Sequence, residues 1–288
     1  MSANGRAEQI IVITGASTGI GRACAMHFDQ LGFSVFAGVR RDADGAALRS
    51  AASERLTPLR IDVTDGATIA AAREQIEAAA SGVGVRGLVN NAGIGVGGPL
   101  EFVPLDDLRR QLEVNVIGQV AVTQAFLPML RQARGRIVNI GSISGRMATP
   151  FVAPYAASKF ALEAITDALR VELRPWGIGV AIVEPGSIAT PIWEKAKDTS
   201  KQVSDDLSPR GRELYGAAVS SLRETMAEFE KRAIPAERVA KAVSHALLSR
   251  RPKTRYLVGT DARLQAALAA VVPDRINDRL IARQMHLP

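Results

Sequence analysis

The sequence has almost no cysteine or histidine. A single cysteine, Cys24, occurs among 288 residues, so the chain cannot close a disulfide on itself. Only three histidines are present, and no His/Cys cluster has the spacing of zinc ligands, which excludes the common zinc motifs. We therefore expect metal-free chemistry in a reducing compartment.

Long apolar runs are absent as well. No run of about 18 apolar residues could span a bilayer, and the first residues lack the apolar stretch of a signal peptide. We therefore expect a soluble, cytoplasmic protein without a transmembrane segment.

The composition is that of an ordinary globular protein. Hydrophobic residues make up 47% of the chain and charged residues 23%, which excludes disorder for most of its length. The formal net charge is +7, but Lys and Arg are scattered and mostly accompanied by Asp or Glu, so we expect no nucleic-acid binding. A milder consequence of the charge is attraction of anionic ligands, such as the phosphates of a dinucleotide.

Short apolar, β-branched runs alternate with longer helical patterns along the chain. The expected strands are residues 9–14, 34–39, 56–63, 87–91, 136–140, 178–183 and 255–258. Helices are expected over residues 20–31, 68–80, 105–132, 154–173 and 236–249. This alternation predicts an α/β fold: a Rossmann-like, doubly wound parallel sheet of about seven strands with helices on both faces. Ligands of such folds bind at the carboxyl ends of the strands.

The strand–helix rhythm indicates a single domain over residues 1–260, with no internal repeat. Residues 192–234 interrupt the rhythm with a mixed polar and helical insertion that includes Trp193 and Phe229. Long insertions beside ligand sites often form lids, so we expect a substrate lid there. The tail, residues 261–288, combines apolar residues with arginines. It is expected to be a helical extension that packs on the domain or a partner subunit, with contact to a membrane surface as the alternative.

A glycine-rich turn joins the first expected strand to the first expected helix. Gly15, Gly19 and Gly21 permit a tight turn and close backbone approach, leaving the amides at the helix start free to meet a pyrophosphate. The spacing is neither GxGxxG nor a P-loop, and a purely structural turn remains the alternative. The candidate cofactor residues of this segment are Gly15, Ser17, Thr18, Gly19, Ile20 and Gly21.

Three further segments with ligand-binding character follow expected strands. The run Asn90–Gly93 ends the fourth strand with amide side chains, and Asp62 and Val63 end the third, within reach of an adenine amine. Pro185–Thr190 follows the sixth strand, where Pro fixes the turn, Gly permits close approach, and exposed amides with the Thr190 hydroxyl suit a carboxamide or phosphate. The candidate residues are Asp62, Val63, Asn90, Ala92, Gly93, Pro185, Gly186, Ile188 and Thr190.

Tyr155 and Lys159 lie four residues apart in a helical pattern, and Ser142 precedes Tyr155 by thirteen residues. The helical spacing puts the phenol and the ammonium on one helix face. A fixed cation beside a phenol favours the phenolate, which would lower the pKa of Tyr155 toward the working range. Ser142 could then hold a substrate oxygen against the phenol. A pair like this on its own is more typical of a solvated helix face, so the other motifs must decide.

Taken in order, these motifs resemble those of the short-chain dehydrogenase/reductases of the single-domain kind, over about residues 8 to 190. They read TGASTGIG at 14–21, NNAG at 90–93, YAASK at 155–159 and PGSIAT at 185–190, with Asn115 and Ser142 between them. The resemblance implies a catalytic set of Asn115, Ser142, Tyr155 and Lys159. It also implies that the glycines carry the pyrophosphate, Asp62 the adenine, Asn90 the adenine ribose, Lys159 the nicotinamide ribose, and Ile188 and Thr190 the nicotinamide end.

The end of the second strand bears on the choice of cofactor. NAD sites place an acid there to hold the ribose 2′-hydroxyl, whereas an Arg accommodates a 2′-phosphate. Val39 stands at the acid position and Arg40 follows it, which favours NADP(H), with Arg41 and Ser17 as further phosphate partners. NAD(H) stays open, because Asp42 could serve in another loop register.

The expected reaction is hydride transfer between the nicotinamide and a carbonyl carbon or its alcohol, with Tyr155 passing the proton and Lys159 lowering its pKa. By the resemblance, Asn115 shapes a helix kink that holds a water in the proton relay. Apolar residues near the expected strand ends indicate a lipophilic alcohol or ketone, of the steroid, retinol or long-chain type. They are Ile94, Val96, Met147, Phe151, Val152, Ile192 and Trp193, with core or subunit contacts as the alternative.

A catalytically silent, cofactor-sensing regulator of the same fold is the alternative function. The resemblance also implies a homodimer or homotetramer with the helices over residues 105–132 and 154–173 at the interface.

Overall fold

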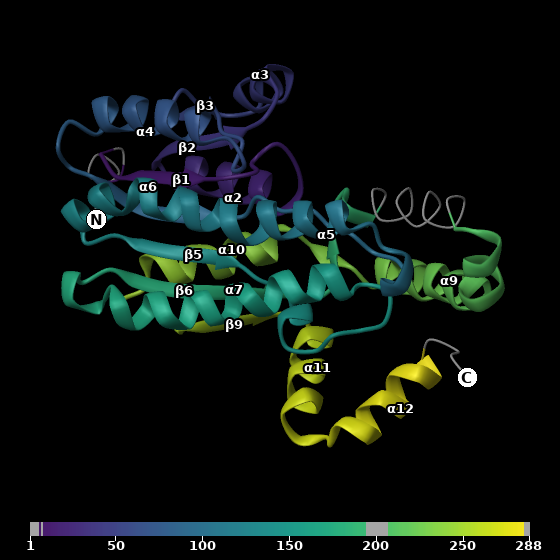
Figure 1. Ribbon diagram of the computed structural model, residues 1–288. Helices are drawn as coiled ribbons and strands as arrows, with labels where there is room; N and C mark the ends of the chain where they lie inside the picture. The colour runs from purple at the N-terminus through teal and green to yellow at the C-terminus, as the bar shows by residue number, and fades with distance from the viewer. Residues whose placement is uncertain (1–5, 7, 194–206, 285–288) are drawn as a thin grey trace.

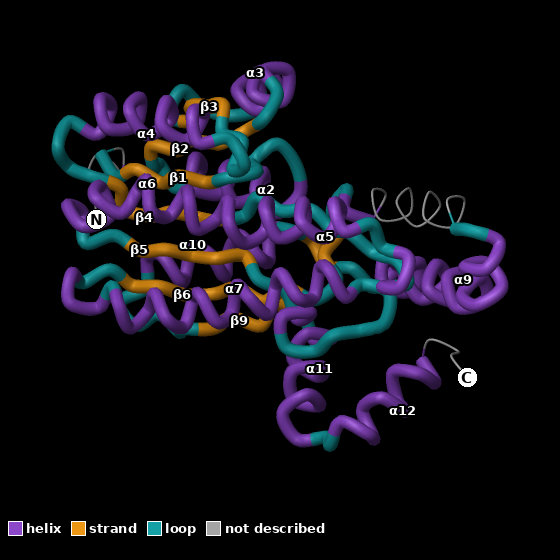
Figure 2. Tube along the Cα trace, viewed as in Figure 1, coloured by secondary structure: helices purple, strands orange, loops and turns teal. Residues whose placement is uncertain are grey.

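The computed structural model describes residue 6 and residues 8–193 and 207–284 of the chain. Seven parallel strands form one sheet in the order β3-β2-β1-β4-β5-β6-β9 (Figures 1 and 2). The strands are β1 (Ile10–Ile13), β2 (Ser34–Val39), β3 (Leu56–Arg60), β4 (Val85–Asn90), β5 (Arg136–Ile140), β6 (Gly179–Pro185) and β9 (Arg255–Val258). The predicted doubly wound parallel sheet is confirmed.

Helices cover both faces of the sheet, which is why its central strands are apolar throughout. All four residues of β1 are buried, as expected for a strand packed on both sides. One face carries α2 (Gly19–Gln30), α3 (Asp42–Ser50) and α10 (Glu237–Leu248), whose core includes Phe28, Leu48 and Val243. The other carries α4 (Gly66–Ala80), α6 (Gly118–Ala133) and α7 (Ala153–Glu172), with Ile76 and Phe126 in the core.

The strand order reverses between β1 and β4. From β1 the chain proceeds outward to β2 and β3, then crosses back to β4 on the other side and continues to β5, β6 and β9. The connections that follow β1 and β4 therefore diverge, and the carboxyl ends of these strands border a crevice. The glycine turn after β1 and the Asn91–Gly93 segment after β4 lie at this point.

Most expected strands and helices lie within two residues of their predicted bounds, and two differ more. β3 ends at Arg60 rather than residue 63, because the Asp62 amide hydrogen-bonds the Thr68 hydroxyl (3.0 Å) instead of a neighbouring strand. The helix expected over residues 105–132 is divided into α5 (Leu105–Leu112), a π-helical turn (Glu113–Ile117) and α6. Helix α3 was not expected, since its short, alanine-rich sequence carries a weak apolar pattern.

The segment beyond β6 leaves the sheet and returns to it. β7 (Ile188–Ala189) pairs with β8 (Ile234–Pro235) in a two-stranded parallel sheet, which brings the two ends of the expected insertion together. Within the insertion, α9 (Pro209–Lys231) is helical, whereas residues 194–206 lie outside the described residues.

The chain continues after β9 into α11 (Thr260–Val271) and α12 (Asp274–Gln284), which extend away from the sheet (Figure 1). Over the part of the chain that the structure describes, every helix is too short or too polar to traverse a bilayer.

Candidate active site

A cavity of about 1630 Å³ lies at the carboxyl ends of the strands. Most of the residues predicted from the sequence line it: Gly15, Ser17, Thr18, Gly19, Ile20, Arg40, Asp62, Val63, Ala92, Gly93, Ser142, Tyr155, Lys159, Pro185, Gly186, Ile188 and Thr190. Gly21, Asn90 and Asn115 do not, and each has another role.

The glycine turn is a close-packed cradle. Gly15 and Gly19 have φ of 64° and 55°, in the region that L side chains rarely adopt. A Cβ on Gly15 would lie 2.8 Å from the Ala92 Cα, and one on Gly21 would overlap the Gly15 carbonyl oxygen. Gly21 is therefore needed for packing of the turn rather than for ligand contact. Thr18, the N-cap of α2, makes no side-chain cap hydrogen bond, so the first amides of α2 face the cavity without that partner.

Asn91 and Thr14 fix the cradle against β4. The Asn91 side-chain amide donates to the carbonyl oxygens of Thr14 and Gly15, both at 3.0 Å. The Thr14 hydroxyl accepts from the amides of Asn91 (3.0 Å) and Ala92 (3.1 Å). These bonds hold the two strand ends at a fixed separation. The sequence alone does not predict this role for either residue.

Asn90, predicted to contact the adenine ribose, does not line the cavity. Its side chain is 1% exposed and lies within the core, where Nδ2 donates to the Thr123 hydroxyl (2.8 Å) and to Asn139 Oδ1 (2.9 Å). Asn139 in turn donates to the Thr166 hydroxyl (2.8 Å). Asn90 thus joins β4 to β5 and α6 through Nδ2, while its buried Oδ1 has no hydrogen-bond partner among the described residues.

Asp62 lies at the cavity wall with its carboxylate held by Thr64, whose amide (3.0 Å) and hydroxyl (2.8 Å) both donate to it. Partial burial acts to raise the pKa of Asp62, but these hydrogen bonds and the charges of Arg40 and Arg60 outweigh it and keep the pKa below its usual value. Asp62 is therefore an ionised acceptor, suited to an amine donor.

Ser142, Tyr155 and Lys159 meet at the end of β5. Ser142 follows that strand and caps a 3₁₀ turn, accepting from the Ser144 amide at 3.1 Å. Tyr155 and Lys159 lie one turn apart on α7, and the Lys159 ammonium is 5.6 Å from the centre of the Tyr155 ring. Lys159 is 5% exposed and donates to the Ile140 carbonyl oxygen at 2.8 Å. The expected grouping on one helix face is therefore present.

The pKa of Tyr155 differs in direction from the expectation. Burial raises the pKa of the phenol above its ordinary value, and a hydrogen bond with Ser142 opposes that effect only in part. Burial also lowers the pKa of Lys159 to about 8, while the nearby Glu163 acts to raise it. The sequence indicates the charge of Lys159, which lowers the pKa of Tyr155, but not the low-dielectric surroundings of both groups, which raise it.

Asn115 lies at the centre of the π-helical turn and ties it to the cavity wall. Its side chain is fully buried, accepts from the Ile94 amide (2.9 Å) and donates to the Ile94 carbonyl oxygen (3.0 Å). It also donates to the Ser158 hydroxyl (3.1 Å), which donates to the Tyr155 carbonyl oxygen (2.7 Å). Asn115 thus positions the Tyr155 turn of α7.

Gln111, one turn before Asn115, also hydrogen-bonds the backbone of the segment that begins at Ile94. The sequence alone did not point to this residue. It is fully buried, donates to the Ile94 carbonyl oxygen (2.9 Å) and accepts from the Val96 amide (2.6 Å). Its spacing of four residues from Asn115 is the signal that could have indicated a shared face. Together the two amides fix residues 94–96, which border the cavity.

The comparisons with known proteins agree with this geometry. The family model described as short chain dehydrogenase matches residues 9–201. The chain belongs to the short-chain dehydrogenase family. Retinol dehydrogenase 5 of Mus musculus is 38% identical over 95% of this chain and 88% of that protein. The NADPH-dependent 3-dehydrocapnine reductase of Ornithobacterium rhinotracheale is 36% identical over 95% and 96%. A Burkholderia phymatum short-chain dehydrogenase/reductase, solved with NAD, superposes with a TM-score of 0.76 at 26% identity, over 90% of this chain and 92% of that one.

In this short-chain dehydrogenase the residues that line the cavity form two groups, which we call the dinucleotide arm and the apolar arm. One runs from the glycine turn past Arg40 and Asp62, and its φ-positive glycines and helix-start amides fit a dinucleotide pyrophosphate. The other is largely apolar and receives side chains from α9 and α12. Its lining includes Val96, Phe102, Met147, Phe151, Val152, Ile192, Trp193, Leu222, Met226, Phe229 and Ile281. Among the described residues, no group of His, Cys, Asp and Glu is placed to hold a metal.

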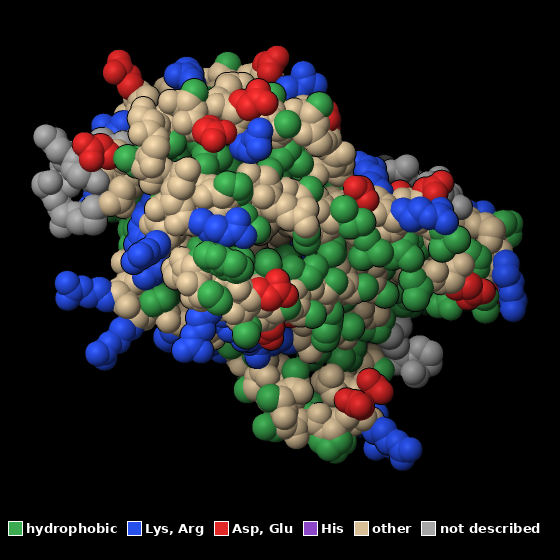
Figure 3. Space-filling view, turned by 60° about the vertical axis from the view of Figure 1, so that its left-hand side comes forward, with side chains coloured by type: hydrophobic (Ala, Val, Ile, Leu, Met, Phe, Trp, Pro, Cys, Tyr) green, Lys and Arg blue, Asp and Glu red, His purple; other side chains and the backbone are tan. Residues whose placement is uncertain are grey.

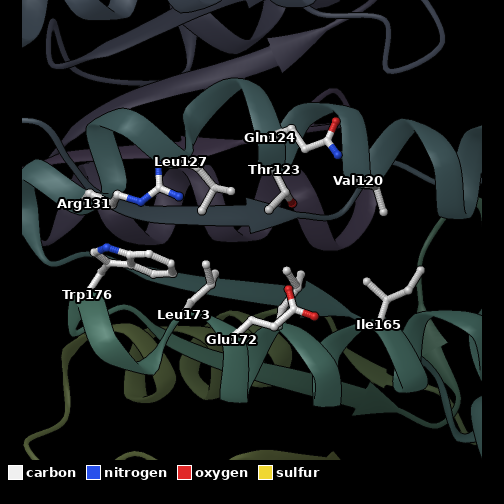
Figure 4. Close-up of a pocket in the computed structure, with 10 residues that line it drawn as sticks. Val120, Thr123, Gln124, Leu127, Arg131, Ile165, Glu172, Leu173 and Trp176 are labelled. Carbon is white, nitrogen blue, oxygen red and sulfur yellow. The ribbon is translucent and has the colours of Figure 1, made fainter.

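Apolar surface continues outside the cavity. Figure 3 shows hydrophobic side chains gathered on the right-hand part of the face it presents. A separate groove of about 440 Å³ lies between α6 and α7 of this dehydrogenase (Figure 4). There the Arg131 guanidinium lies 4.8 Å from the centre of the Trp176 ring, beside Leu127 and Leu173.

Proposed function

We propose that the protein is an NADP(H)-preferring oxidoreductase that transfers a hydride between the nicotinamide and a lipophilic secondary alcohol, ketone or aldehyde. The observation that carries the proposal is that Ser142, Tyr155 and Lys159 line the same cavity as the residues of the dinucleotide arm and of the apolar arm.

The chemistry divides between cofactor and protein. A bound nicotinamide dinucleotide supplies or accepts the hydride. The Tyr155 hydroxyl gives a proton to the substrate oxygen, or takes it from that oxygen, as general acid or base. Ser142 hydrogen-bonds the same oxygen, and the Lys159 ammonium, 5.6 Å from the ring, favours the phenolate against the effect of burial. Asn115 and Gln111 hold the turn that carries Tyr155.

The NADP(H) preference is argued from the end of β2. Val39 is buried and offers no acid for a ribose 2′-hydroxyl, whereas the exposed Arg40 lines the cavity. Arg41, named above as a second phosphate partner, is instead engaged in a two-bond contact with Asp44 (2.9 and 2.8 Å). Arg40 is therefore the guanidinium to which we assign the 2′-phosphate. The NADPH-dependent relative supports this choice, and the NAD-bound structural neighbour keeps NAD(H) as the alternative.

The lipophilic substrate class is argued from the apolar arm. Phe151 and Leu222 pack together there with Met226 and Ile281 around them, so the loop before α7 forms one wall jointly with α9 and α12. Such a wall favours an apolar body bearing one reactive oxygen. The similarity to a retinol dehydrogenase supports the same class. We also propose that the insertion over residues 192–234 acts as the lid of this arm.

We propose that the groove between α6 and α7 contacts a second copy of the chain in a homodimer or homotetramer. We also propose that the protein is cytoplasmic. Sedimentation velocity tests the assembly: Trp176→Ala, which removes the ring beneath Arg131, should shift the wild-type species toward monomer. A wild-type monomer at all concentrations would contradict it.

The decisive experiment is a panel of retinoid, ketosteroid, long-chain and short polar carbonyls, assayed with NADPH and NADH by loss of reduced-nicotinamide absorbance. Turnover should be fastest with an apolar carbonyl and NADPH. Tyr155→Phe should lower kcat by at least about 100-fold while cofactor binding persists. Tyr256→Phe, a tyrosine on β9 outside the cavity lining, is the matched control and should keep wild-type kcat. Cofactor binding without turnover of any carbonyl would favour the cofactor-sensing regulator.

A further inference from the structure

A buried ion cluster lies beneath the loop that carries Ser142. Glu184, at the end of β6, is fully buried, and its carboxylate receives Arg146 through a two-bond contact that includes Nη2 to Oε1 at 3.0 Å. Arg255 of β9 lies 3.6 Å from Glu184 through Nε and 3.1 Å from Glu163 of α7 through Nη2. The two buried carboxylates therefore share Arg255, while Arg146 pairs with Glu184, and both arginine side chains are partly exposed.

Glu163 is the less satisfied carboxylate of the two. Its Oε2 accepts from Arg255 Nε at 3.2 Å, but its buried Oε1 has no hydrogen-bond partner among the described residues. Arg255 is also shared with Asp167, at 2.7 Å. A buried carboxylate oxygen without a hydrogen-bond partner destabilises the folded protein. Its presence at Glu163 therefore suggests a role other than packing.

Glu163 stands one helical turn after Lys159, on the same side of α7. The two are tied to the Ser142 loop through Gly145, where a Cβ would lie 3.0 Å from the Lys159 carbonyl oxygen and 3.2 Å from Glu163 Cγ. The absence of a side chain at Gly145 thus allows the loop to rest directly on both residues. Glu163 does not line the cavity, so it acts on the site only through Lys159 and this loop.

The charges that face Glu163 come from four elements. They are Lys159 and Asp167 on α7, Glu184 on β6, Arg255 on β9, and Arg146 after the 3₁₀ turn. Burial, together with the charge of Glu184, raises the pKa of Glu163 to about 7, against the two guanidiniums. Above that pH Glu163 is ionised, so it offers a negative charge to Lys159 over the range in which Lys159 titrates, near pH 8.

We propose that Glu163 is a positioning residue that keeps the buried Lys159 ammonium protonated, and so sets the alkaline limit of the range in which the Tyr155–Lys159 pair works. The second half of this inference rests on the proposed function, whereas the effect on Lys159 does not. An opposite charge nearby favours the charged form of a lysine, and low-dielectric surroundings strengthen the effect.

The experiment replaces the charge without changing the shape. Glu163→Gln keeps an oxygen for Arg255, and Glu163→Asp keeps the charge on a shorter stem. Asp167→Asn is the matched control, because Asp167 lies one turn further from Lys159 and shares Arg255. Lysine labelled with ¹³C at Cε is titrated by NMR in each variant, with the Lys159 signal assigned by its loss in Lys159→Met. The pH dependence of kcat/KM is measured on the same proteins.

Glu163→Gln should lower the titration midpoint of Lys159 by about one pH unit. The alkaline limb of the kcat/KM profile should move by the same amount. In Glu163→Asp the Lys159 midpoint should return most of the way to its wild-type value, and in Asp167→Asn that midpoint should stay at the wild-type value. An unchanged Lys159 midpoint in Glu163→Gln, or an equal change in Asp167→Asn, overturns the proposal. A purely structural role would lower Tm and leave the Lys159 titration in place, which also overturns it. The NMR titration needs no substrate, so a failure of the proposed function shows separately, as absent turnover.

Discussion

Replacing Lys159 by methionine is expected to stabilise the protein at neutral pH while abolishing turnover. The Lys159 side chain is 5% exposed, and burial lowers its pKa from 10.5 to about 8. Each pKa unit corresponds to about 1.4 kcal/mol, so keeping the ammonium charged in the folded state costs about 3 kcal/mol. Methionine fills similar space without charge but loses the hydrogen bond to Ile140, worth about 2 kcal/mol because the donor is charged. The variant should therefore gain about 1 kcal/mol in free energy of unfolding at pH 7.

The pH dependence of this gain has a definite sign. Between pH 8 and 10.5 the folded protein has released the Lys159 proton that the unfolded chain still holds, so wild-type stability rises with pH in this window. The methionine variant lacks this increase, and its advantage should shrink toward pH 9.5.

Urea unfolding followed by circular dichroism at pH 7 and 9.5 measures both effects. Lys241→Met removes an exposed lysine of α10 and is the matched control, with no expected change beyond about 0.5 kcal/mol. A Lys159→Met variant that is less stable than wild type at pH 7, or an advantage that grows with pH, would refute the reasoning.

Four shorter predictions concern other parts of the site. Arg40→Ala should weaken NADPH binding about tenfold in calorimetry and leave NADH unchanged; equal losses would contradict the assignment. Gly21→Ala should cost about 1–3 kcal/mol in urea unfolding, because its Cβ overlaps the Gly15 carbonyl, and an unchanged midpoint would be the contrary result. Gln111→Leu should lose about 1–3 kcal/mol, since backbone groups of Ile94 and Val96 lose their partner; wild-type stability would contradict it. Leu222→Ala should raise KM for long apolar carbonyls only, and a uniform rise would argue against the apolar arm.

The fold was accessible from the sequence because its signals are local. Apolar, β-branched runs such as Ile10–Ile13 favour strands in most contexts. Gly15 must be a glycine because the turn requires a positive φ at that position. The alternation of these elements was sufficient for the parallel sheet, and the strand order puts the glycine turn beside the Asn91–Gly93 segment.

The side-chain contacts that the sequence did not indicate have partners that are distant in sequence. Asn90 has the residue type and place of a ligand contact, but its side chain is directed to Asn139, 49 residues away. Gln111 looked like an ordinary helix residue until the fold placed Ile94 against it. The rise in the pKa of Tyr155 follows from burial, which no spacing of charges along a helix can report.

The amino-acid sequence by itself thus determined the order of strands and helices, the glycine cradle, and the pairing of Tyr155 with Lys159 on one helix face. Only the tertiary structure decided which amides support the backbone, that Arg41 is engaged by Asp44, and that Glu163 and Glu184 share Arg255. The physical reason is that dihedral preferences and helical spacing act within a few residues, whereas burial and electrostatic interaction depend on groups that only folding brings together.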